Sequence, residues 1–115
     1  MKRTELSELG EFGLINRINQ HVKIYHPDTI KGIGDDAAVL AKTEDTLTLV
    51  SSDMLIEGIH FDLTYFPLKH LGYKAVAVNV SDIAAMNGLP KQMTISLGVS
   101  NRFPVEAIDE LYEGI

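Results

Sequence analysis

The segment KGIGDDAAVL, residues 31–40, joins a glycine-containing turn to a short apolar strand and places two acids, Asp35 and Asp36, between them. Neighbouring like charges repel each other, and a carboxylate at the edge of an apolar core is costly unless a cation or a hydrogen bond compensates it. Gly-Asp is also a common turn pair, so these acids could instead be ordinary solvated turn residues. The rest of the sequence must supply the compensation or make it unnecessary.

The composition is that of a globular protein and limits the possible partners. The chain has 115 residues, 45% hydrophobic and 23% charged, with a net charge of −6. This length suits a single domain, residues 1–115. No apolar run approaches the roughly 20 residues of a membrane-spanning helix, and no signal peptide is visible, so we expect no membrane partner. The scattered Lys and Arg argue against nucleic acid, and the absence of cysteine fits a cytoplasmic location.

The spacing of apolar residues predicts an α/β arrangement. A helix is expected from about residue 11 to about residue 20, and a long one within residues 67–90 that stops at Gly88. A last helix opens near Pro104. Apolar and β-branched runs predict strands over residues 37–42, 47–55 and 91–100.

Two further acids occupy unusual places in these elements. Asp53 lies at the carboxyl end of the second expected strand, where ligand-binding groups are common, and the hydroxyl groups of Ser51 and Ser52 precede it. Asp82 lies near the middle of the long helix, with Asn79 one turn earlier on the same face. Because that helix is apolar nearly all round, we expect it to be largely buried, and a buried carboxylate needs a cation, hydrogen bonds or a raised pKa.

One divalent cation site would compensate these carboxylates together. All the candidate ligands are oxygen atoms, which favours Mg²⁺ over Zn²⁺, and the histidines show no paired zinc spacing. A Mg²⁺ site beside a glycine-containing loop is typical of phosphoryl chemistry, although the Walker pattern GxxxxGK[ST] is absent. Plainer interpretations stay open: Asp53 as a strand-end residue, Asp82 paired with a lysine, His60 as a packed histidine and Tyr112 as a core residue.

Three segments resemble, in order and spacing, the N-terminal domain of the thiamine-monophosphate kinase family. They are GIGDDAAVL (32–40), SSDMLIEGIHF (51–61) and GYKAVAVNVSDIAAMNGLP (72–90). This family belongs to the superfamily of aminoimidazole ribonucleotide synthetase. The resemblance implies an α/β (α+β) fold in which a mixed β-sheet carries helices on one face, and in which two such sheets pair in a homodimer.

The resemblance also implies a reaction and its residues. The family phosphorylates thiamine phosphate to thiamine diphosphate with ATP, using several Mg²⁺ ions, direct transfer and no covalent intermediate. No catalytic acid or base is expected, because the acceptor phosphate oxygen is already anionic. The implied residues are the metal ligands Asp36, Ser51, Ser52, Asp53 and Asp82, a substrate contact at His60 and a nucleotide contact at Tyr112.

The sequence departs from the family pattern in two places. Asn87 stands between Met86 and Gly88, where many members run Met-Gly directly. The chain also ends at Ile115 without a helix stop, before the family's later Gly-Gly-Asp motif and its C-terminal domain. We therefore expect residues 1–115 to be a truncated N-terminal ATP- and Mg²⁺-binding domain that is inactive alone.

Two other functions stay open. One is a different ATP-dependent enzyme of the superfamily, such as the hydrogenase maturation carbamoyl dehydratase, which is close in NVSDIAAM (79–86) but lacks EGIHF (57–61). Selenophosphate synthetase fits less well, because it needs an N-terminal Cys or selenocysteine and this chain has neither. The purine-synthesis member also fits less well, because it shows Gly-Val-Gly-Thr-Lys after its Asp, whereas the sequence here is DMLIEGIHF (53–61). The other is a non-catalytic dimerisation module whose acids are merely solvated. Stabilisation by Mg²⁺ distinguishes the kinase from such a module.

Overall fold

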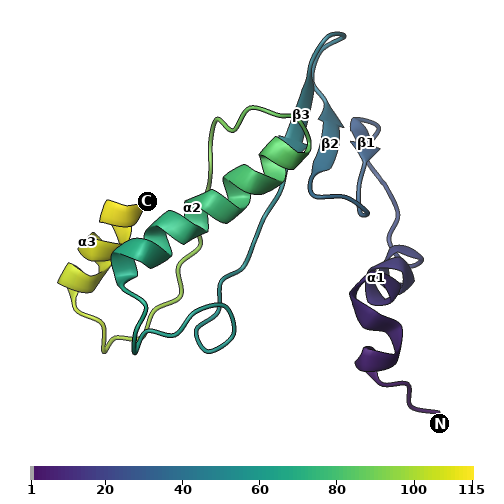
Figure 1. Ribbon diagram of the computed structural model, residues 1–115. Helices are drawn as coiled ribbons and strands as arrows, with labels where there is room; N and C mark the ends of the chain where they lie inside the picture. Colours follow the sequence, from purple (N-terminus) through teal and green to yellow (C-terminus); the bar gives the residue numbers. More distant parts are fainter. Residues whose placement is uncertain (1) are drawn as a thin grey trace. The chain divides into compact units, whose positions relative to one another are not determined.

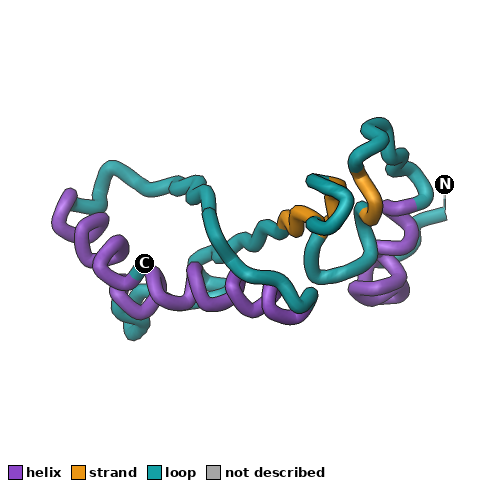
Figure 2. The backbone as a smooth tube through the Cα atoms, turned by 90° about the horizontal axis from the view of Figure 1, so that it is seen from above, coloured by secondary structure: helices purple, strands orange, loops and turns teal. Residues whose placement is uncertain are grey.

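The computed structural model describes residues 2–115 and contains three helices and three strands, in the order α1, β1, β2, β3, α2 and α3 (Figure 1). The chain divides into two compact units, the N-terminal unit Met1–Val50 and the C-terminal unit Ser51–Ile115. All three strands belong to the N-terminal unit (Figure 2). The α+β class expected from the sequence is confirmed, while the single-domain organisation stays a prediction.

Helix α1, Leu6–Asn19, begins earlier than the sequence predicted. The Glu8 carboxylate accepts the Glu5 N–H at 3.4 Å, which satisfies a backbone donor at the start of the helix. Gly10 then interrupts the helical backbone with φ +68° and ψ 180°. The helix that follows this kink is the one the apolar spacing indicated, and the turn before it depends on a local cap.

The sheet is antiparallel throughout, in the order β1-β2-β3, with β1 at Thr29–Lys31, β2 at Ala38–Ala41 and β3 at Leu47–Val50. Between β2 and β3, the Thr43 N–H donates to the Thr46 carbonyl at 3.2 Å, which closes the hairpin. The strands expected over residues 37–42 and 47–55 are therefore confirmed in part, and β1 was missed. A mixed sheet was expected, and the described strands do not form one.

The register of the hairpin sets the small core of the N-terminal unit. Ala38 faces Val50 across β2 and β3, and Val39 faces Leu49. Ala37 and Val39 are 3% and 9% exposed and are the buried apolar residues of this unit. The acids Asp35 and Asp36 thus come directly before the residues that the sheet buries.

The strand expected over residues 91–100 is wrong: this segment forms neither strand nor helix. Its alternate apolar side chains are Met93, Ile95, Leu97 and Val99, and each is between 40% and 52% exposed. The alternation is that of a strand, but a strand also needs a neighbour that accepts and donates backbone hydrogen bonds. In the described residues no such neighbour pairs with this segment.

The C-terminal unit is built on the packing of α2, Leu68–Ala85, against α3, Val105–Gly114. Two glycines allow the two backbones to come this close. A Cβ at Gly72 would overlap the Leu111 carbonyl, and a Cβ at Gly114 would overlap the Lys69 carbonyl. Leu111, only 7% exposed, is the buried apolar side chain of α3. Small residues therefore fix how closely the two helices approach.

Helix α2 is less buried than its apolar sequence suggested. Gly72 is its one fully buried residue, and Tyr73 and Val80 are exposed. The reason is that α3, ten residues long, is the one element of the C-terminal unit that packs closely against this helix of 18 residues. No helix of residues 2–115 has the length and apolarity needed to cross a membrane.

Helix α2 ends close to where the sequence predicted, and Asn87 is the residue that ends it. Asn87 adopts φ +57°, in the left-handed region. Its N–H donates to the Ala84 carbonyl at 2.9 Å, and the Gly88 N–H donates to the Ile83 carbonyl at 3.0 Å. This is the Schellman arrangement, in which asparagine sometimes takes the place of glycine. The Asn87 that departs from the family pattern thus supplies the helix stop.

Alanine at the helix contact should destabilise the C-terminal unit. We expect Gly72→Ala and Gly114→Ala each to lower the free energy of unfolding by about 1–3 kcal/mol, because a new methyl group must push two backbones apart. Alanine otherwise favours a helix interior over glycine by about 1 kcal/mol, so propensity alone predicts the opposite sign. Urea unfolding measures the change.

Gly98→Ala is the matched control. A Cβ at Gly98 meets nothing within 4 Å, and this glycine has no positive φ. Its free energy of unfolding should stay within about 0.5 kcal/mol of the parent value. Equal stability of all three variants would contradict the close packing of α2 and α3.

Candidate functional site

The two adjacent acids of the opening segment have different surroundings. Lys31 Nζ lies 2.9 Å from Asp35 Oδ2, and Asp35 Oδ1 accepts the Asp36 N–H at 2.9 Å. The hydrogen bond from Lys31, helped by the Asp36 N–H and by the charge of Lys31, holds the pKa of the Asp35 carboxyl below its usual value. Asp35 is therefore compensated locally, without a metal ion.

Asp36 keeps a free carboxylate. It is exposed, and none of the hydrogen bonds or ion pairs of residues 2–115 involves its side-chain oxygens. Its only partner in this loop is Asp35, which accepts its backbone N–H. Two like charges can stand side by side here because one is paired with a lysine and the other is solvated.

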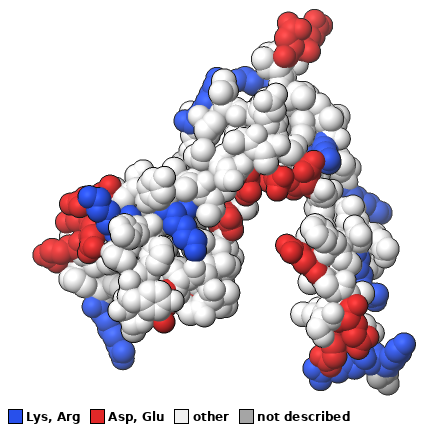
Figure 3. Space-filling model, in the orientation of Figure 1, with Lys and Arg blue, Asp and Glu red and all other residues white. Residues whose placement is uncertain are grey.

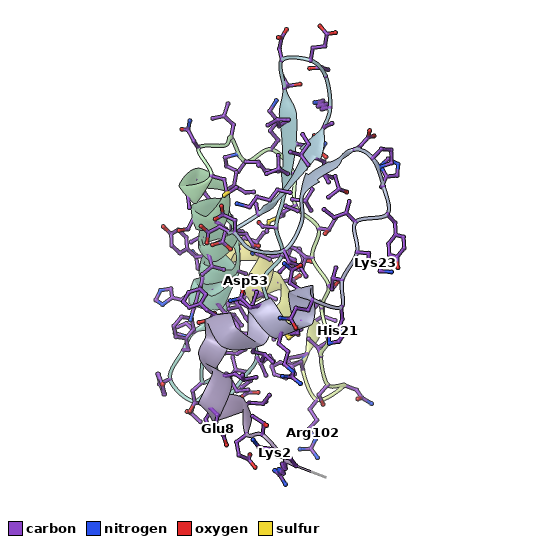
Figure 4. All side chains as sticks on the ribbon, turned by 90° about the vertical axis from the view of Figure 1, so that its right-hand side faces the viewer. Lys2, Glu8, His21, Lys23, Asp53 and Arg102 are labelled. Carbon is purple, nitrogen blue, oxygen red and sulfur yellow. The ribbon has the colours of Figure 1, made fainter. Side chains whose placement is uncertain are left out.

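Ser51, Ser52 and Asp53 follow β3 but do not continue it as a strand. Asp53, which Figure 4 labels, is exposed, and its Oδ1 accepts the Met54 N–H at 2.7 Å. Its Oδ2 takes part in no hydrogen bond of the described chain. Ser51 is half-buried and Ser52 is exposed. The segment thus offers one free carboxylate oxygen and two hydroxyl groups.

Asp82 lies on α2 and is half-buried, not buried as its apolar helix suggested. In fact no polar or charged residue among residues 2–115 is fully buried. Asn79 donates its side-chain amide to the Ala75 carbonyl at 2.7 Å, which leaves its own carbonyl oxygen free. The expected cost of a buried carboxylate is therefore absent, since water reaches each of these acids.

An apolar hollow of about 660 Å³ lies in the C-terminal unit, bounded by α2, α3 and residues 93–100. Asp53 and Asn79 line it, whereas Asp82 does not. Much of the wall is aliphatic and includes Leu71, Ala75, Ile95, Leu97, Ile108 and Leu111. The structure thus brings Asp53 and Asn79 to one surface and leaves Asp82 outside it.

The donor atoms of the candidate site suit a hard divalent cation. They are carboxylate and hydroxyl oxygens, which Mg²⁺ prefers. Within either unit, however, the residues that the structure describes form no group of three or more acidic or histidine side chains that could hold a metal ion. The chemistry of the ligands therefore fits Mg²⁺, and their grouping stays a prediction.

His60 lies in a tight loop before α2 and is exposed. Its Nδ1 accepts the Ile56 N–H at 2.9 Å, and its main-chain carbonyl accepts a hydrogen bond from Lys74 Nζ at 2.7 Å. Sequence reasoning identified His60 but missed Lys74. The available signal was a lysine that directly precedes the apolar run AVAV, residues 75–78, of α2.

Tyr112 lies on α3 and is 49% exposed, so it is not the core residue of that helix. Its neighbour Leu111 is the buried residue instead. An exposed tyrosine is available for stacking, and the role of Tyr112 as a nucleotide contact stays a prediction.

The surface carries Lys and Arg side chains scattered among acidic ones, as Figure 3 shows for one face.

Residues 34–115 match the model of a family described as AIR synthase related protein, N-terminal domain. Several thiamine-monophosphate kinases are similar in sequence. The one from Bacillus subtilis (strain 168) is 41% identical over 107 residues, which are 93% of this chain and 33% of that protein. The one from Aquifex aeolicus (strain VF5) is 41% identical over 110 residues, 96% of this chain and 33% of that protein.

The thiamine-monophosphate kinase from Escherichia coli (strain K12) is 43% identical over 88 residues, 76% of this chain and 27% of that protein. The chain thus spans about a third of the length of the curated relatives it matches. No solved structure matches it. Because the family model covers most of the chain, including every candidate site residue, the chain belongs to the AIR synthase related protein family and carries its N-terminal domain.

Proposed function

We propose that this chain is the ATP- and Mg²⁺-binding part of an enzyme that phosphorylates thiamine phosphate to thiamine diphosphate. The observation that carries this proposal is the similarity to proteins named thiamine-monophosphate kinase, at 36–41% identity over 93–100% of the chain in three relatives. The family match over residues 34–115 agrees with it. Because the chain spans about a third of those relatives, the complete reaction is proposed for the longer protein and not for these residues alone.

The metal ligands we propose are Asp36, Ser51, Ser52, Asp53 and Asp82. Two features of the residues support this. The Asp36 and Asp53 carboxylates are exposed and keep unused oxygens, and the donor set contains only oxygen. When bound, Mg²⁺ ions neutralise and orient the phosphate groups of ATP.

We propose no catalytic acid or base for this reaction. His60 contacts the substrate and Tyr112 contacts the nucleotide. The acceptor oxygen of thiamine phosphate is already anionic, so it needs no base to remove a proton before it attacks. The protein's task is then to position two anionic substrates and to exclude competing water.

Asp53→Asn tests the metal site. In the longest polypeptide that contains this chain, we expect Asp53→Asn to lower the rate of thiamine diphosphate formation by more than about 100-fold, because a neutral amide holds Mg²⁺ far less well than a carboxylate. Asp45→Asn removes the same charge from the exposed turn between β2 and β3 and should leave the rate unchanged. Product is measured chromatographically after incubation with ATP, Mg²⁺ and thiamine phosphate.

Failure of the parent polypeptide to make thiamine diphosphate would overturn the proposed function. Equal loss in both variants would overturn the assignment of Asp53.

Thermal melting of the 115-residue chain is a second test of the proposed metal and nucleotide site. A rise in Tm that needs both Mg²⁺ and a non-hydrolysable ATP analogue, and disappears in Asp53→Asn, is the result expected of a ligand that binds only the folded state.

Lys31→Met tests whether Asp35 is compensated by its pairing with Lys31. This substitution should raise the pKa of the Asp35 carboxyl toward its usual value, because the Lys31 hydrogen bond is the main cause of the lowered pKa. A carboxyl whose pKa is lower in the folded than in the unfolded state stabilises the fold above the unfolded pKa. That stabilisation is lost as the pH falls through the folded pKa.

The Tm of Lys31→Met should thus be below the parent Tm at neutral pH, and the difference should vanish once Asp35 is protonated. NMR titration of the Asp35 carboxyl carbon measures the pKa directly. Lys42→Met is the control, since Lys42 takes part in none of the ion pairs of residues 2–115. If Asp35 titrates at the same pH in all three proteins, Lys31 does not pair with it.

We also propose that the protein is a homodimer. The alternate apolar side chains of residues 93–99 support this, because they remain exposed and form a surface that a second chain could cover. We expect light scattering at micromolar concentration to give twice the chain mass. Leu97→Lys should shift the protein toward monomer, while Thr94→Lys, at a polar position of the same segment, should not. A monomeric parent protein would contradict the proposal.

A further inference from the structure

The loop that carries His60 is closed by its own hydrogen bonds. The Ile56 carbonyl accepts the N–H groups of Ile59 at 3.1 Å and of His60 at 2.9 Å. The Gly58 N–H donates to the Phe61 carbonyl at 2.7 Å, and Gly58 has φ +79°, which favours glycine. The loop is the small ring of the trace before α2 in Figure 1. Its shape is therefore set by the backbone.

Lys74 ties this loop to α2. Its Nζ donates to the His60 carbonyl at 2.7 Å, across 14 positions of sequence. The same amine lies 5.8 Å from the centre of the Phe66 ring, which in turn meets the His70 ring edge-on at 6.3 Å. Among the described residues Lys74 forms no ion pair with a carboxylate. Its charge is thus directed at the His60 loop and not at an acid.

The hydrogen bonds of His60 also decide which ring nitrogen carries the proton. A backbone N–H can only donate, so Nδ1, which accepts from Ile56, is unprotonated in the neutral ring. The proton of that ring is therefore on Nε2. Since His60 is exposed and Nε2 takes part in none of the hydrogen bonds of residues 2–115, this nitrogen presents a free N–H donor.

We infer that Lys74 is a positioning residue, which holds the His60 loop so that the Nε2–H of His60 can donate to an anionic phosphate oxygen of the substrate. The inference rests on the proposed function for the identity of the substrate, but the positioning itself rests on the contacts of Lys74 with the His60 carbonyl and the Phe66 ring. An N–H donor suits a phosphate oxygen, which only accepts hydrogen bonds. Lys74 acts through the loop and need not touch the substrate.

Lys74→Met tests the positioning in the 115-residue chain. Methionine keeps the unbranched apolar stem and removes the donor. We expect amide hydrogen exchange of Ile56, Gly58 and His60 to become at least about tenfold faster, since a hydrogen bond from a charged donor is lost. We also expect the nitrogen-15 shifts of the His60 ring to move from one fixed tautomer toward the average of two.

Lys69→Met is the matched control. Lys69 lies on the same helix, is exposed, and its amine takes part in no hydrogen bond or ion pair of the described chain. Its exchange rates and ring shifts should equal those of the parent. Lys74→Arg keeps a charged donor and should restore at least part of the protection. If Lys74→Met leaves both exchange and ring shifts at their parent values, the inference is wrong.

Enzyme kinetics of the longest polypeptide that contains this chain distinguish the positioning role of Lys74 from the substrate contact of His60. If both roles hold, Lys74→Met raises the KM for thiamine phosphate at least about tenfold with a smaller change in kcat, because the contact between His60 and the substrate has lost its orientation. If exchange accelerates but the KM does not change, Lys74 does position the loop, and the assignment of His60 to the substrate fails. If the parent makes no thiamine diphosphate, the proposed function fails, while the exchange and ring-shift results still decide the role of Lys74.

Discussion

The close contact between α2 and α3 is the constraint on which the C-terminal unit depends. Gly72 and Gly114 let the two backbones meet where any side chain would overlap a carbonyl. With α2 held in this way, three residues of functional interest take their positions from it. Lys74 reaches the loop that precedes the helix, Asn79 faces the hollow, and Asp82 stands outside it. A shift of α2 would move all three together.

The acids of this chain illustrate how little like-charge repulsion costs while the carboxylates stay solvated. Asp35 is paired with Lys31, and Asp36 and Asp53 are exposed. A free-energy cost arises only when several carboxylates are brought together or desolvated, and a bound divalent cation makes gathering them favourable instead. Under the proposed function, free and solvated acids are what one expects of ligands before the ion binds.

The regular elements could be predicted from the sequence where local chemistry decides them. Apolar spacing and terminal signals indicated α2 and α3, and apolar and β-branched runs indicated β2 and β3. The strand expected over residues 91–100 shows the limit of such reasoning. Its alternation is present, but strand formation requires a neighbouring backbone, which a local pattern cannot supply. The short strand β1 was missed for the same reason, because its existence depends on pairing with β2.

The candidate site shows the same division. The positions of the acids in the expected elements singled them out, and the resemblance to a known family gave the roles of these acids and of His60. Neither source says which of these residues contact one another. The role of Lys74 depends on a hydrogen bond between residues 14 positions apart, so only the three-dimensional structure could reveal it. The expected burial of Asp82 was wrong because the pattern of a helix gives its polarity and not the number of elements that cover it.

The loop proposed to bind the acceptor phosphate and the residues proposed to bind Mg²⁺ and ATP therefore differ in how far they are already ordered in the free chain. The His60 loop is already fixed by backbone hydrogen bonds and by Lys74, so binding a phosphate oxygen there costs little ordering. The proposed metal ligands are not held together in this way. Within either unit, the described residues form no group of three or more acidic or histidine side chains that could hold a metal ion. Under the proposed function, ligands that repel one another until a cation arrives would come together only when Mg²⁺ binds with the nucleotide. On this argument the acceptor side is organised in advance, and the donor side is organised by its own ligand.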